Sequence, residues 1–226
     1  MKIAIPLYDR FTSLDAVGPY EALSRLPGAE TVIVAERTGP VPDTVGSLSV
    51  VATATFDEVT DPDVVVVPGG PGQRHQMSDG PLHRWLRAVD AHTTWTTSVC
   101  TGSLILAAAG LLRGRRATSH WLAVDQLAEY GVTAVADRVV VDGKYVTSAG
   151  VSAGIDMALG LAERIAGERT AQEIQLMMEY DPDPPHDAGS REKAPAAVVE
   201  QLLAQREQRL AGARPATPAV AEGALS

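Results

Sequence analysis

The residues from Thr94 to Gly110, TWTTSVCTGSLILAAAG, constrain the fold of this chain more than any other stretch. A β-rich run ends at Val99, Cys100 follows directly, and a helix of small residues opens at Thr101. A strand that leads straight into a helix places the junction residue on a sharp turn, over free N–H groups and the positive end of the helix dipole. Such a position predicts a lowered thiol pKa and a nucleophile. The alternative is a buried core cysteine, because free cysteines are among the most buried residues.

Strands and helices alternate along the rest of the chain. This predicts an α/β fold with a doubly wound, mostly parallel sheet and helices on both faces. The run Val64 to Val67 is apolar throughout, which is typical of a parallel strand buried on both faces. Asp142-Gly143 predicts a hairpin turn between two further strands, because both residues tolerate positive φ. The other predicted strands cover residues 2–8, 31–35 and 94–99, with an antiparallel excursion at the sheet edge over 39–55.

Helices are predicted where apolar residues follow turn or capping signals. Pro19 is expected near the first turn of the first helix, because helix starts tolerate proline. The predicted helices cover residues 19–26, 81–91, 102–110, 118–130, 153–166, 170–180 and 194–210.

We expect one α/β domain over residues 1–190. The sequence DPDPP at 181–185 interrupts regular structure, and residues 191–211 are expected to form a helical extension that packs on the domain or on a partner subunit. The Ala/Pro-rich residues 212–226 are predicted to be a disordered tail.

Composition excludes several classes of partner. The net charge of −9 argues against nucleic acid and anionic membranes. No apolar run approaches the ~20 residues that span a bilayer, and MKIAIPLYDRF reads as a first strand rather than a signal peptide. With one cysteine no internal disulfide can form, so we expect a cytoplasmic setting. His75, His83, His92 and His186 lack the spacing of metal ligands, so no metal is expected.

Chemistry-bearing residues gather at one predicted edge of the sheet. In doubly wound sheets the ligand site lies at the carboxyl ends of the strands. That rule groups Asp15, the glycine loop with Gly70 and Gly72, Cys100, and the turn at 150–154 that contains Val151. Asp15 is a candidate acid–base partner for the thiol, although a loop or N-cap role is the alternative reading of its position.

Several motifs occur in an order that resembles the ThiJ/PfpI superfamily. They are LDAVGPYEAL, VVVVPGGPG, SVCTGSLILAAAGLLRGRRATSHW, GVSAGIDMALGLA and EYDPDPPHDAGS, and the resemblance covers roughly residues 3 to 200. Many members have histidine directly after the nucleophilic cysteine and glutamate on the first loop. Here those positions are Thr101 and Asp15, which is the pattern of the members that hydrate isonitriles.

The resemblance implies a flavodoxin-like fold of the class I glutamine amidotransferase type with a nucleophile elbow. It also implies a homodimer without cofactor or metal, acting on a small isonitrile. Cys100 matches the nucleophile, Asp15 the acid–base carboxyl, Thr101 a residue whose N–H lines the site, and Gly70 a loop N–H that faces the substrate.

His120 is a further candidate because it follows Thr118-Ser119 at a predicted helix start. It is expected among the substrate-binding residues with Gly70, Gly72 and Val151. In the alternative reading Thr118 or Ser119 caps the helix and His120 only packs locally. The glycine loop lacks the Lys-Ser/Thr ending of a P-loop, so it does not predict nucleotide binding.

Two other functions are consistent with the sequence. One is a different cysteine enzyme of the superfamily, glyoxalase-like or an amidase, against which Thr101 weighs. The other is a ligand-sensing domain like that of AraC-type regulators. Such regulators need a helix-turn-helix reader, and no recognition helix is visible after Ser190.

Overall fold

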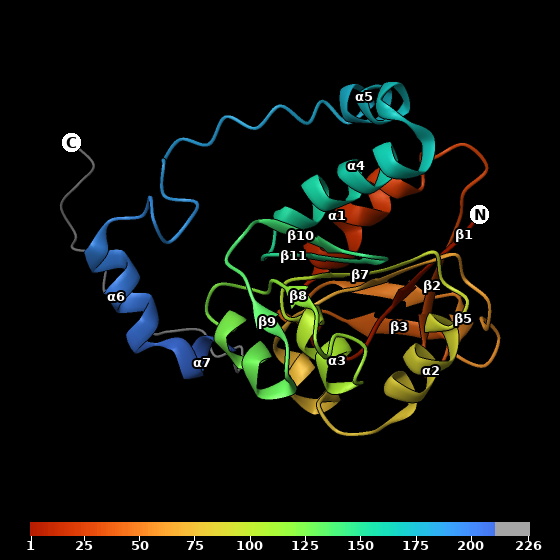
Figure 1. The fold of residues 1–226 in the computed structure, drawn as a ribbon, viewed down its shortest axis with the longest axis horizontal. Helices are drawn as coiled ribbons and strands as arrows, with labels where there is room; N and C mark the ends of the chain where they lie inside the picture. Colours follow the sequence, from red (N-terminus) through yellow and green to blue (C-terminus); the bar gives the residue numbers. More distant parts are fainter. Residues whose placement is uncertain (211–226) are drawn as a thin grey trace.

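A seven-stranded sheet forms the centre of the molecule in the computed structural model, which describes residues 1–210. The strand order is β10-β11-β7-β6-β1-β2-β5 (Figure 1), and every neighbouring pair is parallel except the hairpin β10–β11. The predicted doubly wound, mostly parallel sheet is therefore confirmed. Its strands are β1 (Lys2–Pro6), β2 (Glu30–Ala35), β5 (Ala54–Thr55), β6 (Val64–Val67), β7 (Trp95–Val99), β10 (Val139–Asp142) and β11 (Tyr145–Ser148).

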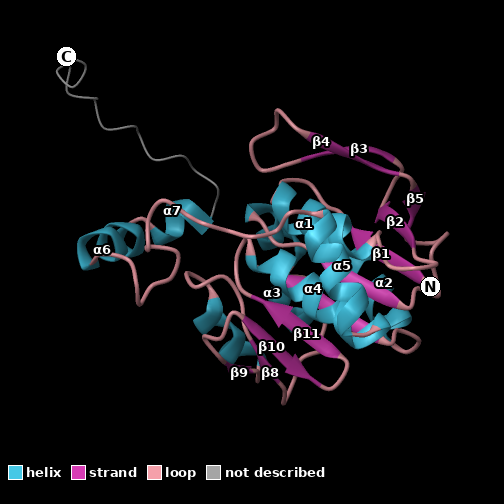
Figure 2. Cartoon of the chain, turned by 90° about the horizontal axis from the view of Figure 1, so that it is seen from above, coloured by secondary structure: helices cyan, strands magenta, loops and turns pink. Residues whose placement is uncertain are grey.

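Helices cover both faces of this sheet, also as predicted (Figures 1 and 2). On one face α1 (Ser13–Leu23) packs beside α4 (Ala153–Ala166), and α5 (Glu168–Met177) packs on α4. The other face carries α2 (Pro81–Asp90), α3 (Gly102–Ala108) and the 3-10 helix η2 (Val124–Tyr130). All four valines of β6 are fully buried, as a strand covered on both faces requires.

Two small sheets lie outside the main one. Strands β3 (Gly39–Pro42) and β4 (Ser49–Ala52) form the expected antiparallel excursion. Strands β8 (Arg116–Ala117) and β9 (Thr133–Ala134) pair in parallel and were not predicted, because two-residue strands leave no periodic pattern.

The first helix begins six residues earlier than predicted, at Ser13. Pro19 lies inside α1 rather than in its first turn, and the Pro19 ring approaches the position where a side chain on Gly154 would begin. Packing between α1 and α4 thus overrides the preference of proline for helix starts. As a result Asp15 lies in the first turn of a helix and not in a loop.

Two other predicted helices differ in detail. Residues 121–123 form turns, and the helix predicted over 118–130 begins later, at Val124, and is the 3-10 helix η2, although it ends at Tyr130 as expected. The helix predicted over 194–210 is two helices, α6 (Ala196–Ala204) and α7 (Arg206–Leu210). Both lie beside the main body (Figure 2), and α7 is tethered by the ion pairs Arg74–Glu207 and Arg206–Asp125.

The division into a domain over 1–190 and an extension stays a prediction. Residue 211 of that extension and the tail predicted over 212–226 lie outside the described residues. Within residues 1–210, no helix combines the length and the apolar character needed to cross a membrane.

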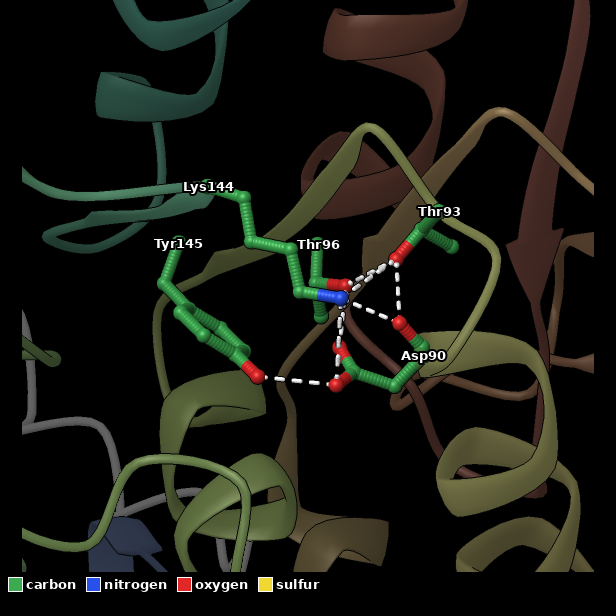
Figure 3. A network of polar contacts seen from close by, with 5 residues as sticks. All are labelled: Asp90, Thr93, Thr96, Lys144 and Tyr145. Atoms are coloured by element: carbon green, nitrogen blue, oxygen red, sulfur yellow. Dashed lines mark hydrogen bonds and ion pairs between the residues drawn. The ribbon is translucent and has the colours of Figure 1, made fainter.

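A polar network fixes the starts of β7 and β11 (Figure 3). The Asp90 carboxylate accepts hydrogen bonds from Thr96 at 2.6 Å and from Tyr145 at 2.8 Å, and it pairs with Lys144 at 3.2 Å. Burial and the contact with Asp90 raise the pKa of Tyr145 to about 12. Because β7 and β11 are parallel, their carboxyl ends emerge together at the opposite edge, where Cys100 lies.

Candidate active site

Cys100 occupies the sharp turn between β7 and α3, and its backbone is in the left-handed region with φ 58°. Non-glycine residues rarely adopt this conformation, and surrounding contacts must maintain it. The Cys100 N–H lies 3.0 Å from the Ser148 carbonyl oxygen and 3.2 Å from that of Ala149, and donates to both. Its carbonyl accepts hydroxyl bonds from Ser119 at 3.0 Å and from Ser103 at 3.2 Å. The predicted nucleophile elbow is therefore confirmed.

Glycine at position 102 lets the helix start so close to the sheet. A Cβ atom on Gly102 would begin 2.1 Å from the Val67 carbonyl oxygen, at the end of β6. Only a residue without a side chain fits at that distance. The sequence Cys-Thr-Gly therefore brings the elbow against the loop that follows β6.

Asp15 reaches the elbow from the first turn of α1 and is completely buried. Its Oδ2 accepts the Gly69 N–H at 2.9 Å, while Oδ1 has no hydrogen-bond partner among the described residues. Burial raises the pKa of Asp15 to about 7, against the opposing effects of the Gly69 N–H and the Cys100 thiol. The alternative reading of Asp15 as an N-cap is wrong, because Thr12 holds that position.

The thiol of Cys100 is also buried, with 5% of the residue exposed. Burial raises its pKa well above the ordinary value, and the charge of Asp15 raises it further. Hydrogen bonds from the backbone and side chain of Thr101 oppose this effect. The lowered thiol pKa expected from the helix start is therefore wrong, because the desolvation of the sulfur outweighs the N–H groups of a short helix.

Thr101 joins the elbow to the glycine loop after β6. The Gly70 N–H donates to Thr101 Oγ1 at 3.0 Å, so it reaches a substrate only if that bond is exchanged. Gly70 has φ 128°, and a Cβ on Gly69 would begin 2.5 Å from the Thr101 nitrogen. Gly69 is required by the close approach to Asp15 and Thr101, and Gly70 by its positive φ and by the close approach to the backbone of residues 10–12.

Gly72 and Val151 make packing contacts with other parts of the chain. A Cβ on Gly72 would begin 1.8 Å from the Asp9 carbonyl oxygen, and its N–H donates to Arg10, so Gly72 packs beneath that loop. Val151 packs against the hydrophobic core. A substrate-binding role for either residue stays a prediction.

His120 approaches the thiol across Gly150. A side chain at position 150 would begin 2.2 Å from His120 Cδ2 and 3.2 Å from the Cys100 sulfur. His120 Nδ1 accepts the Leu122 N–H at 3.2 Å, and burial lowers the pKa of the ring. The ring is thus a neutral group beside the site, and a direct part in binding or catalysis stays a prediction.

A cavity of about 200 Å³ lies beside Gly150. Its walls include Ser119, Trp121, Ala149 and residues 189–192 of the C-terminal region. The cavity therefore lies between Gly150 and the segment that precedes α6. Cys100, Asp15 and His120 do not line it, although a Cβ on Gly150 would begin 3.2 Å from the Cys100 sulfur.

The structure adds three residues that the sequence did not single out. Ser103 and Ser119 donate hydroxyl hydrogen bonds to the Cys100 carbonyl oxygen. Tyr8 donates to the Pro68 carbonyl oxygen at 2.8 Å, and burial, together with the charges of Asp15 and Cys100, raises its pKa. Tyr8 follows β1 at the carboxyl edge of the sheet, so its position was a usable signal; the hydroxyl contacts of the serines were not visible in the sequence.

Over residues 1–210 there is no group of three or more His, Cys, Asp or Glu residues arranged to hold a metal ion.

Comparisons with known proteins place this geometry in a family. The profile of the DJ-1/PfpI family matches residues 1–164. Isonitrile hydratase of Pseudomonas putida is 44% identical over 201 residues, covering 89% of this chain and 88% of that protein. Deglycase PH1704 of Pyrococcus horikoshii is 31% identical over 150 residues, covering 66% of this chain and 89% of that protein.

A solved structure shares almost the whole fold. The crystal structure of a ThiJ/PfpI family protein from Pseudomonas syringae superposes with a TM-score of 0.88 at 41% identity, over 93% of this chain and 90% of that one. Together with the elbow at Cys100, these matches show that the chain belongs to the DJ-1/PfpI family.

Proposed function

We propose that this protein is a cysteine-dependent isonitrile hydratase, which converts an isonitrile and water into an N-substituted formamide. The observation that carries the proposal is the pairing of the Cys100 sulfur with a buried carboxyl group whose Oδ1 has no partner among the described residues. The 44% identity to a protein named isonitrile hydratase over most of both chains supports the same substrate class.

The reaction requires a nucleophile and a proton at one carbon atom. The terminal carbon of R–N≡C accepts the Cys100 thiolate while protonated Asp15 delivers a proton to that carbon, which gives a thioimidate, R–N=CH–S–Cys. Asp15, now a carboxylate, takes a proton from water as the water oxygen attacks the same carbon. Asp15 then passes this proton to the nitrogen, which gives the tetrahedral adduct R–NH–CH(OH)–S–Cys. As the C–S bond breaks and the thiolate leaves, Asp15 takes the hydroxyl proton, and R–NH–CHO is released with Asp15 protonated again.

The raised pKa values of both groups suit this sequence. Since both groups are buried, the pair favours a single negative charge at neutral pH. Moving the proton from the thiol to the carboxylate creates the thiolate and the acid together, without a proton from solvent. The narrow, rod-shaped isonitrile group also suits a cysteine of which only 5% is exposed. The cavity beside Gly150 is the place we propose for the R group.

We further infer a homodimer in a cytoplasmic setting, with the isonitrile as the small-molecule partner and no nucleic acid or membrane partner. The family resemblance supports the dimer. The single cysteine and the net charge of −9 support the setting and argue against anionic partners. No cofactor or metal is part of the proposed mechanism.

A substrate panel tests the function. Purified protein with chelator is offered cyclohexyl isonitrile, methylglyoxal and a peptide amide in parallel, and the products are quantified by mass spectrometry. We expect N-cyclohexylformamide to form at a rate well above turnover of the other two. The deglycase relative makes a different cysteine enzyme the second candidate, and turnover of methylglyoxal alone would favour it. Reversible binding without turnover would favour a sensor.

A further inference from the structure

The carbonyl group of Cys100 and the N–H group of Thr101 belong to the same peptide unit. The described chain contains no cis peptide bonds, so in this unit the C=O and N–H groups point in opposite directions within one plane. The Thr101 N–H lies on the side opposite the carbonyl oxygen, where its interaction with the Cys100 sulfur lowers the pKa of the thiol. Contacts that fix the orientation of the Cys100 carbonyl therefore also fix the direction of the Thr101 N–H relative to the sulfur.

Two hydroxyl groups from separate parts of the chain fix that carbonyl. Ser103 Oγ lies 3.2 Å from the Cys100 oxygen and comes from the first turn of α3. Ser119 Oγ lies 3.0 Å from the same oxygen and comes from the segment after β8, 19 residues along the chain. Both serines are buried, with 0% and 1% exposed, so water does not compete for these bonds.

We propose that Ser103 and Ser119 are positioning residues that lock the Cys100–Thr101 peptide plane and polarise its N–H toward the sulfur. Hydrogen bonds accepted by a carbonyl strengthen the bond that the N–H of the same peptide donates. Two donors on one carbonyl also hold Cys100 at φ 58°, a conformation that it does not favour by itself. The inference rests on Cys100 as the nucleophile of the proposed function and adds a device that favours the thiolate over the thiol.

Alkylation by iodoacetamide tests the proposal without using an isonitrile. Cys100 is the only cysteine, so the rate of modification reports one thiolate. At pH 8 we expect Ser103→Ala and Ser119→Ala each to slow alkylation about threefold to tenfold, since a shift of one pKa unit changes the thiolate fraction tenfold and a more basic thiolate recovers part of the rate. Ser119→Thr keeps a hydroxyl and should restore the rate.

The matched control is Thr97→Val on β7, which removes a buried hydroxyl bond to the Val65 carbonyl on β6 without touching the elbow peptide. This variant should react at the wild-type rate even if its unfolding midpoint falls. A second readout is the Thr101 amide proton in spectra of protein labelled with ¹⁵N-threonine. We expect it to move upfield in the Ser→Ala variants and to keep its position in Thr97→Val.

Alkylation within twofold of wild type in both folded single variants, with an unmoved Thr101 amide proton, would overturn the proposal. Slow alkylation in Thr97→Val as well would also overturn it, because the effect would then come from general loosening. Loss of isonitrile turnover is not used as a readout, so failure of the proposed function and failure of this inference stay distinguishable.

Discussion

At position 15 a carboxyl group is fully buried, and one of its oxygens has no hydrogen-bond partner in the described part of the chain. Neither property could be predicted from the sequence, which placed Asp15 in a loop. The pairing with Cys100 was predictable, because the rule on strand ends brings both residues to one edge of the sheet. The direction of the thiol pKa was not, since it depends on how completely packing excludes water from the sulfur.

Replacing Asp15 with asparagine keeps the size of the side chain but removes the carboxyl group that can give and take a proton. We expect Asp15→Asn to lower kcat/KM at least ~10²-fold, the usual scale for a positioned acid–base group. A variant within a few-fold of wild type would reduce Asp15 to a structural residue. Steady-state assays with an isonitrile measure this directly.

The direction in which the wild-type kcat/KM changes with pH follows from the protonation states of Asp15 and Cys100. Below the Asp15 pKa of about 7 both groups are protonated and no thiolate forms. Loss of one proton gives the reactive state, so kcat/KM should rise through an apparent pKa near 7. It should fall again only at the much higher pH at which the second proton leaves. A rate that falls as pH rises through 7 would contradict this assignment.

The same carboxyl group should destabilise the fold at high pH. Its folded pKa of about 7 lies above the ordinary value of 3.8, so between these values the folded state binds more protons and stability falls as pH rises. The ionised form costs on the order of 4 kcal/mol. We therefore expect Asp15→Asn to be more stable than wild type at pH 8 in urea denaturation. The two proteins should be similar at pH 4, and equal stability at pH 8 would refute the buried charge.

At the scale of elements, the molecule is built around the turn from β7 into α3. The sequence predicted this turn because a β-rich run, one cysteine and a small-residue helix follow each other without a linker. The apolar run of β6 was equally readable. The start of α1 was not, because Pro19 signals a helix start and only the packing of α1 on α4 keeps it inside the helix. Three-residue details such as the turns at 121–123 also depend on contacts with distant segments.

Strain in this turn can be measured by comparing two variants that both lack the thiol. Glycine adopts φ 58° readily and alanine does not. We expect Cys100→Gly to be more stable than Cys100→Ala by up to about 1 kcal/mol in chemical denaturation, even though glycine gains more entropy on unfolding.

The control for this comparison is Gly160→Ala in α4, where an added Cβ would meet no atom within 4 Å. There alanine should be the more stable residue by up to about 1 kcal/mol, as in an ordinary helix. If Cys100→Ala is more stable than Cys100→Gly, the backbone at position 100 is not strained.

For the whole molecule, an extended segment and the most exposed of the large apolar side chains lie next to each other in the described part of the chain. Leu176 and Met177, at the end of α5, are 77% and 76% exposed, and residues 181–191 beyond them are exposed throughout. A second subunit would cover such a surface. The sequence predicted the break at 181–185 from its prolines, but a single chain does not indicate what the segment packs against.

We expect a homodimer at micromolar concentration. Light scattering coupled to size-exclusion chromatography should give about twice the chain mass of 23.8 kDa. The substitution Leu176→Glu, which places a charge on the exposed end of α5, should shift the mass toward that of one chain. A wild-type mass of 23.8 kDa would contradict the expected dimer.

The central claim is that isonitrile hydration passes through a covalent bond to Cys100. Rapid mixing with an aryl isonitrile, acid quenching and mass spectrometry of the protein test it directly. We predict a transient gain of one isonitrile mass, located on the peptide that contains Cys100, which appears before the formamide and decays as the formamide accumulates. Cys100→Ala should stay folded and form neither adduct nor product. Formamide production by Cys100→Ala would contradict the account, and so would turnover by the wild type that never passes through a labelled Cys100.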